Sequence, residues 1–312
     1  MALKFRRIGE TDLNCSIIGL GTGRLTSYSS SISRRTAIRL VHAAADLGIN
    51  VIDTADIYGQ GDSELVIGNS IRGRRDRFIV ASKVGYRFAR AGRLAGILKP
   101  ILKPLVQRLQ TARELAATMR QHAAVADSFR QDFSPKYITE AIDASLRRLQ
   151  TDYLDILFLH DPPLSDVRSV DAMAALDRVK SAGKIRHIGI STSDPLILEW
   201  LAKCERDVGV VQMAVNPESP SSLQSLLSKL SGAGIGVVAN HIFGSAALHS
   251  NPRLVEFGQR YSLSTRQLLI GLATTSPSIA TALIGTTSED HLRQNVEALA
   301  AVEKVSFDQL IL

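Results

Sequence analysis

Four ionisable side chains stand at or just beyond the ends of short apolar runs in this 312-residue chain. Asp53, Lys83 and His160 each close a run of β-branched and aliphatic residues, and Tyr58 follows Asp53 five positions later. Such groups are costly at the ends of buried strands unless they contact one another or a ligand. A carboxylate, a phenol, an ammonium and an imidazole that meet can deliver a proton to a carbonyl oxygen, so the pattern indicates an enzyme.

The chemistry that fits these four side chains is the reduction of a carbonyl group. Hydride added to the carbonyl carbon leaves negative charge on the oxygen, which then needs a proton. A tyrosine phenol is too weak an acid near neutral pH unless a neighbouring cation favours the phenolate. We therefore expect Tyr58 to donate the proton, with Lys83 beside it and Asp53 keeping Lys83 charged. His160 is expected to orient the carbonyl and to share in the proton transfer.

The apolar runs belong to a repeating pattern of strand and helix. Between them lie segments with apolar residues at helical spacing, such as the one from Ala37 to Ala45, which stops at Gly48. Ser134 followed by Pro135 opens another in the order of a helix cap and first turn. Near-continuous apolar strands that alternate with helices are typical of parallel strands buried on both faces. The candidate strands are Ser16–Leu20, Asn50–Thr54, Phe78–Lys83, Leu154–His160, Ile185–Ser191, Val210–Val215, Gly236–Asn240 and Ile279–Ile284.

Eight strand–helix units in this length predict an α/β fold, the closed (β/α)8 TIM barrel. An open doubly wound sheet would need a G-x-G-x-x-G fingerprint after its first strand, and the stretch from Gly19 to Gly23 lacks that spacing. Lys4–Ile8 and Asn14–Ser16 flank a turn and predict an N-terminal β-hairpin that closes the bottom of the barrel. We expect one domain over residues 1–312.

One interval between strands, after the strand that bears Lys83, is unusually long, and its surplus runs from Tyr86 to Gln131. This segment holds nine Lys or Arg residues against two acidic ones, so it carries the whole net charge of +7. Apolar residues at helical spacing from Leu94 to Leu109 predict a basic, partly helical insertion. Because it emerges beside the catalytic strand ends, we expect a lid that favours anionic substrates. A plain solvated insertion, or a basic helix that docks on a membrane or a carrier protein, are the alternatives.

Composition argues against several other classes of protein. The charge outside the insertion sums to zero, which is not typical of a general nucleic-acid-binding protein. Cys15 and Cys204 form neither a disulfide framework nor a metal site. Asp56 and Asp161, which lie close to the four ionisable residues in the sequence, are interpreted as structural residues. We find no signal peptide and no apolar run of about 20 residues, so we expect a cytoplasmic protein without integral membrane association. A monomer or a small homo-oligomer is expected.

Taken in order, these motifs resemble the aldo-keto reductase superfamily over nearly the whole chain. The matches surround each of the four ionisable residues and recur at the first, fifth and last strands. They include Gly19-Leu20-Gly21-Thr22, Asp53-Thr54-Ala55-Asp56-Ile57-Tyr58-Gly59, Ser82-Lys83-Val84-Gly85, Leu159-His160-Asp161-Pro162, Ile188-Gly189-Ile190-Ser191 and Ala282-Leu283-Ile284-Gly285. The resemblance implies an oxidoreductase that uses NADP(H), or alternatively NAD(H), and acts on an aldehyde, ketone or sugar hemiacetal.

The resemblance also assigns residues to the cofactor. Ser191 and Gln212 would hydrogen-bond the carboxamide of the nicotinamide. The loop and helix after the last strand would hold the adenosine end, where backbone donors at a helix N-terminus suit phosphate oxygens. The complete set implied is Gly21, Thr22, Gly23, Asp53, Ser191, Thr192, Gln212, Asn240, Gly285, Thr286, Thr287, His291, Gln294 and Asn295.

Several positions depart from the family pattern. Thr192 stands where an Asn is usual, and Asn240 and then His241 occupy the stretch in which a Tyr stacked on the nicotinamide is expected. Gly285 and His291 replace the Lys and Arg often used to hold the 2′-phosphate of NADP. NADPH is favoured as cofactor, and two alternatives stay open. One is an NAD-dependent sugar dehydrogenase, and the other is a cofactor-binding regulatory subunit with little turnover.

Overall fold

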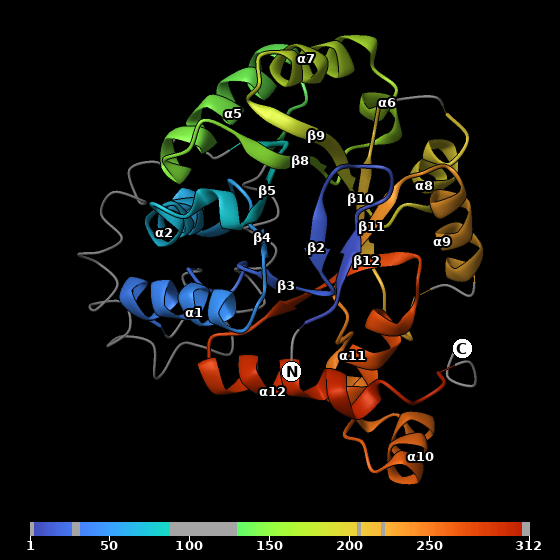
Figure 1. Cartoon of the computed structure of the whole chain (residues 1–312). Helices are drawn as coiled ribbons and strands as arrows, with labels where there is room; N and C mark the ends of the chain where they lie inside the picture. The colour runs from blue at the N-terminus through green and yellow to red at the C-terminus, as the bar shows by residue number, and fades with distance from the viewer. Residues whose placement is uncertain (1–2, 27–31, 88–129, 205–206, 220–221, 308–312) are drawn as a thin grey trace, which may run out of the picture.

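The computed structural model describes residues 3–26, 32–87, 130–204, 207–219 and 222–307, and at its centre the strands form a closed barrel (Figure 1). The strand order around the barrel is β10-β11-β12-β3-β4-β5-β8-β9, and neighbouring strands are parallel. The predicted (β/α)8 barrel is therefore confirmed. The barrel strands are β3 (Ile18–Gly21), β4 (Val51–Asp53), β5 (Ile79–Val84), β8 (Leu154–His160), β9 (Ile185–Ser191), β10 (Val210–Ala214), β11 (Gly236–Asn240) and β12 (Ile279–Gly285).

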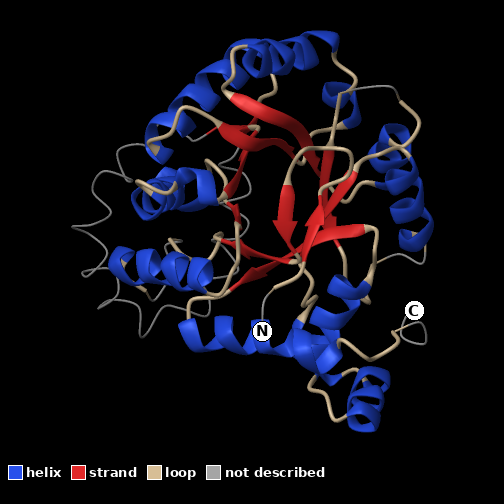
Figure 2. Cartoon of the chain, in the orientation of Figure 1, coloured by secondary structure: helices blue, strands red, loops and turns tan. Residues whose placement is uncertain are grey.

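Helices pack around the outside of the strands and cover the barrel (Figure 2). Ser134 caps α5 with Pro135 in the first turn, as the sequence predicts, and Ser33 caps α1. In Figure 1, α10 lies outside this ring, beyond α11. The helices are α1 (Arg34–Asp46), α2 (Asp62–Ile71), α5 (Pro135–Leu149), α6 (Leu164–Val167), α7 (Val170–Ser181), α8 (Pro195–Leu201), α9 (Leu223–Gly232), α10 (Pro252–Tyr261), α11 (Thr265–Thr275) and α12 (Glu289–Val302).

The predicted N-terminal hairpin is confirmed as the antiparallel pair β1 (Phe5–Arg7) and β2 (Asn14–Ser16). Ile8, in the turn of this hairpin, is fully buried in one cluster with Phe158 from the barrel interior. Gly9 has φ +53°, and a Cβ added there would lie 2.3 Å from the amide nitrogen of Gly236, at the start of β11. The hairpin thus closes the N-terminal end of the barrel, and the carboxyl ends of the strands form the other end.

The predicted insertion begins and ends in a second antiparallel pair, β6 (Tyr86–Arg87) and β7 (Arg130–Gln131). Tyr86 lies opposite Gln131, so the two ends of the insertion are side by side directly after β5. Residues 88–129, on which the predictions of a helical lid and of anionic substrates rest, lie outside the described residues. Among the described residues, the helices lack the length and apolar character that crossing a membrane requires.

Candidate active site

The carboxyl ends of β4, β5 and β8 bring the four ionisable residues together. Lys83 Nζ lies 2.7 Å from both carboxylate oxygens of Asp53 and 2.9 Å from the carbonyl oxygen of Thr54. The hydroxyl of Tyr58, in the 3₁₀ turn that precedes α2, is 3.4 Å from Lys83 Nζ. The ring of His160 stands perpendicular to the ring of Tyr58, with centroids 6.4 Å apart. A carboxylate, an ammonium and a phenol therefore form one chain of contacts, with the imidazole beside it.

The charges in this chain are set by burial and by the neighbours. Burial alone would lower the pKa of Lys83, but the charge of Asp53 and then that of Tyr58 raise the pKa above its ordinary value. Burial raises the pKa of the Tyr58 phenol, and Lys83 only partly offsets this shift. Tyr58 therefore keeps its proton at neutral pH. A phenolate formed there would lie beside a permanent cation.

His160 is neutral at physiological pH. Burial, and then the charge of Lys83, lower the pKa of its imidazole to about 3. Its Nδ1 is buried without a hydrogen-bond partner in the described part of the chain, and its Nε2 is 3.9 Å from the carboxylate of Asp161. A neutral imidazole can donate one N–H to a carbonyl oxygen, so the structure favours the orienting role of His160 over the transfer of a proton.

Gln212 connects Asp53 to the residues assigned to the nicotinamide. Its Nε2 donates to Asp53 Oδ1 at 2.7 Å, and its Oε1 accepts from Ser191 Oγ at 3.0 Å. The hydroxyl of Thr22 donates to the backbone oxygen of Asp53 at 2.9 Å. The sequence analysis missed the contact between Gln212 and Asp53, because β10 and β4 lie on opposite sides of the barrel and meet only when it closes.

The turn that carries Tyr58 rests on a buried ion pair that the sequence analysis also missed. Glu64, which is fully buried, accepts from Arg148 Nε and from Ser82 Oγ, each at 2.6 Å. Gly61 ends the turn with φ +88°, and a Cβ added there would lie 2.7 Å from Arg148 Cδ. Arg148 therefore packs against the turn and fixes its position. Only knowledge of which side chains are buried could have identified this pair.

Glycines assigned to the cofactor lie at the edge of the barrel, and one of them packs against the ring of Tyr58. Gly21 and Gly285 pair across β3 and β12, and a Cβ added at either would meet nothing closer than 3.7 Å. A Cβ added at Gly23 would lie 3.4 Å from the ring of Tyr58. Glycine has no side chain to keep a flat ring away from the backbone, so this edge fits the close approach of a nicotinamide.

Two buried acceptors without partners point in the same direction. The Oδ1 atoms of Asn240 and Asn295 are buried and lack a hydrogen-bond partner among the described residues. Asn240 ends β11, and Asn295 lies on the buried face of α12, whose first turn Ser288 caps. Because a buried acceptor without a donor is costly, these atoms fit contacts to the cofactor.

Other residues assigned to the cofactor stand apart from the four ionisable side chains. The hydroxyl of Thr192 accepts from the amide of Asp194 at 3.1 Å, and that of Thr286 accepts from the amide of Ser288 at 3.1 Å. Both hydroxyls therefore stabilise turns. Thr287 is half-buried, whereas His291 and Gln294 are exposed on α12. None of these residues hydrogen-bonds to the four within the described structure.

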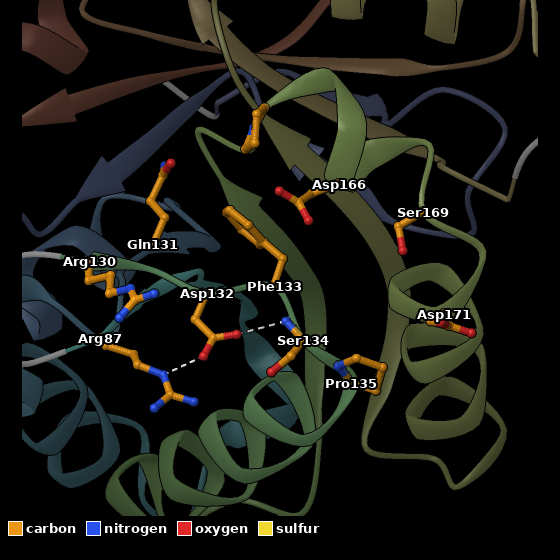
Figure 3. Close-up of a pocket in the computed structure, with 11 residues that line it drawn as sticks. Arg87, Arg130, Gln131, Asp132, Phe133, Ser134, Pro135, Asp166, Ser169 and Asp171 are labelled. Atoms are coloured by element: carbon orange, nitrogen blue, oxygen red, sulfur yellow. Dashed lines mark hydrogen bonds and ion pairs between the residues drawn. The ribbon is translucent and has the colours of Figure 1, made fainter.

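A cavity of about 600 Å³ lies next to this site, between the start of α5 and the α6–α7 segment (Figure 3). Asp132 lies on its wall, where it pairs with Arg87 and accepts from the amide of Ser134 at 2.8 Å. The four ionisable residues do not line this cavity. Gln131 does, and its Nε2 donates to the backbone oxygen of Asp161 at 2.7 Å. The cavity therefore adjoins the loop after His160, but the side chains proposed for catalysis lie outside it.

Comparison with known proteins gives the family. The sequence model of the Aldo/keto reductase family matches residues 17–309. The chain belongs to the aldo-keto reductase family. This aldo-keto reductase is accordingly an NAD(P)H-dependent oxidoreductase.

Three relatives of this aldo-keto reductase match over almost their full length. The "L-galactose dehydrogenase" of Arabidopsis thaliana is 25% identical, with 98% of this chain and 91% of that protein covered. The holo form of an aldo-keto reductase from Bacillus halodurans superposes with a TM-score of 0.76 at 25% identity, covering 99% of this chain and 95% of that one. An aldo-keto reductase from Klebsiella pneumoniae, solved in complex with NADPH, superposes with a TM-score of 0.70 at 25% identity, covering 99% and 93%.

Proposed function

We propose that this enzyme reduces an aldehyde, ketone or sugar to the corresponding alcohol, with NADPH favoured as the hydride donor. The observation that carries the proposal is a contact: the Tyr58 hydroxyl lies 3.4 Å from Lys83 Nζ. Both carboxylate oxygens of Asp53 accept hydrogen bonds from the same Lys83 Nζ. The NADPH complex of the Klebsiella pneumoniae relative supports the cofactor, and the name of the Arabidopsis thaliana relative supports a sugar among the substrates.

Tyr58 is the proton donor in this proposal. When bound, the nicotinamide supplies the hydride. Tyr58 gives its proton to the carbonyl oxygen as negative charge develops there, and Lys83 stabilises the phenolate that remains. Because burial keeps the phenol protonated at neutral pH, the site favours reduction. Oxidation of an alcohol needs the phenolate and is expected only at higher pH.

His160 positions the substrate. Its neutral imidazole donates a hydrogen bond to the same carbonyl oxygen that Tyr58 protonates, and the two rings lie side by side with centroids 6.4 Å apart. Gln212 contributes indirectly, because its hydrogen bond to Asp53 fixes the carboxylate that keeps Lys83 charged. The catalytic residues proposed are therefore Tyr58, Lys83, Asp53 and His160.

The preference for NADPH over NADH is proposed to be small, about tenfold or less, because opposing effects meet at the N-terminus of α12. The positive end of this helix dipole attracts a phosphate. No Lys or Arg occupies positions 285 or 291, and Glu289 and Asp290 place two carboxylates in the first turn of the helix. Those carboxylates are also the observation that favours the second candidate, an NAD-dependent sugar dehydrogenase.

Turnover assays separate these proposals. The purified protein is incubated with NADPH or NADH and a panel of aldehydes, ketones and sugars, and the absorbance of the reduced nicotinamide is followed. We expect the wild type to oxidise the cofactor in the presence of several carbonyl compounds. Lys83→Met should lose this activity, whereas the control Lys136→Met, a change at an exposed lysine, should keep it. Cofactor binding without turnover would instead support a regulatory subunit. The anionic preference predicted from the insertion rests on residues outside the described part, and the proposal does not depend on it.

A further inference from the structure

Left-handed backbone at residues other than glycine marks the rim of the active site. Among the described residues, Gln60, Gln150, Asp161, His241 and Ser262 have φ between +47° and +59°. Gln150 and Ser262 end α5 and α10, where this conformation is common. The other three lie at the carboxyl end of the barrel, in the Tyr58 turn and directly after β8 and β11. Strained residues of this kind collect at functional sites, so their side chains are candidates for a role.

The backbone of Asp161 is held on both sides. Its amide donates to the backbone oxygen of Ser191 at 2.8 Å, and its own oxygen accepts from Gln131 Nε2 at 2.7 Å. These two contacts stabilise φ +47° in the residue that directly follows His160. The surrounding structure therefore fixes the backbone of Asp161 and the direction of its Cα–Cβ bond.

The carboxylate of Asp161 is free to bind a ligand. It makes no hydrogen bond to a described residue, its side chain is 57% exposed, and it lies 3.9 Å from Nε2 of the neutral His160. Its charge acts on the other groups of the site. Burial, and then the charge of Asp161, raise the pKa of Tyr86. Burial also raises the pKa of the Asp161 carboxyl above its ordinary value, and Lys83 and His241 only partly offset this shift. The carboxylate therefore lies beside His160 and is open to solvent.

We propose that Asp161 accepts hydrogen bonds from hydroxyl groups of the substrate and so selects a sugar-like hydroxylated carbonyl compound. This inference rests on the proposed function, because His160 must hold the carbonyl. An ionised carboxylate only accepts hydrogen bonds, so it suits hydroxyl groups and repels a second carboxylate. Because Asp161 Oδ2 lies 3.9 Å from His160 Nε2, a hydroxyl on the carbon next to a carbonyl held by His160 would come within its reach. Neutral hydroxylated substrates are thereby favoured over anionic ones.

Three aldehydes test the proposal. Glyceraldehyde carries hydroxyl groups, propanal has the same carbon chain without them, and succinic semialdehyde carries a carboxylate. The quantity measured is kcat/KM with NADPH, calculated on the concentration of the free, unhydrated aldehyde, so that both aldehydes and variants can be compared. In the wild type we expect glyceraldehyde to be reduced more efficiently than propanal.

Two substitutions keep the left-handed backbone accessible and change only the side chain. Asp161→Gly removes the carboxylate, and we expect kcat/KM for glyceraldehyde to fall at least about tenfold while propanal changes less than about twofold. Asp161→Asn keeps one acceptor without the charge, so an intermediate loss for glyceraldehyde and a gain for succinic semialdehyde are expected. Asp166→Asn, at a carboxylate on the wall of the neighbouring cavity (Figure 3), is the matched control and should change none of the three.

Each outcome decides between the two proposals. If Asp161→Gly lowers kcat/KM for propanal as much as kcat/KM for glyceraldehyde, or changes neither value, Asp161 does not recognise hydroxyl groups. If the wild type reduces propanal at least as well as glyceraldehyde, the selectivity inference fails while the proposed function stands. If the wild type reduces no carbonyl compound with either nicotinamide, the proposed function itself fails.

Discussion

Replacing His160 should change how the stability of the protein depends on pH. The free energy of unfolding rises as the pH rises, and falls as the pH falls, wherever the unfolded state binds more protons than the folded state. His160 has an ordinary pKa of 6.5, and its folded pKa is lowered to about 3. The unfolded chain therefore takes up a proton below pH 6.5 that the folded chain refuses until about pH 3. Stability is fully present above pH 6.5 and is lost progressively as the pH falls through this window.

The size of the effect follows from this window. At pH 5, about 1.5 units below the unfolded pKa, the unfolded state gains about 2 kcal/mol from protonating this histidine, at about 1.36 kcal/mol per unit. This value does not depend on the exact folded pKa as long as that pKa stays well below 5. The His160→Gln variant has no imidazole at this position, so this contribution of about 2 kcal/mol to the pH dependence is absent. We therefore expect the wild type to lose about 2 kcal/mol more than the variant between pH 7 and pH 5.

Urea unfolding of the cofactor-free protein at both pH values measures this difference. Any cavity left by the substitution lowers the stability of the variant at both pH values, so it cancels when the two are subtracted. Equal pH dependence in wild type and variant would mean that the folded protein protonates His160 near its ordinary pKa. The imidazolium would then be available as an acid, and the purely orienting role given to His160 would be wrong.

Two further predictions concern the structure around the site. Arg148→Met should destabilise the protein by about 3–5 kcal/mol because it leaves the fully buried Glu64 without its charged partner, whereas Arg148→Met combined with Glu64→Gln should recover most of that loss. Thermal unfolding checks this, and equal losses in both would refute the argument from an unpaired charge. Replacing residues 88–129 with a short Gly/Ser linker should leave a folded barrel that binds NADPH, because Tyr86 and Gln131 already pair at its base. Circular dichroism and cofactor fluorescence test this. An unfolded product would mean that the replaced segment is needed for the core of the barrel.

Much of the barrel could be predicted because its strands are short apolar runs between helical patterns. The predicted bounds of β8, Leu154–His160, are those observed. The first strand was partly wrong, since Ser16 ends β2 of the hairpin and β3 begins at Ile18. Only Ile17 separates these two strands, so the apolar pattern runs through both without a break. Periodicity cannot show where a chain leaves one sheet and enters another.

The site was predictable where a residue marks the end of a strand and unpredictable where it depends on closure of the barrel. Lys83 and His160 stand out in the sequence because a polar group follows an apolar run. The contact of Gln212 with Asp53 spans the barrel, so it depends on which strands face each other. Asp161 was interpreted as structural, because its left-handed backbone and open carboxylate leave no trace in residue spacing.

Single-turnover reduction by Tyr58→Phe tests the central claim most directly. Protein saturated with NADPH is mixed rapidly with an aldehyde, and the loss of reduced-nicotinamide absorbance is followed alongside the wild type. Because Tyr58 supplies the proton and not the cofactor grip, we predict a rate at least about a hundredfold lower, with NADPH affinity changed less than about threefold. A rate close to that of the wild type would show that another group protonates the carbonyl, and would contradict the account.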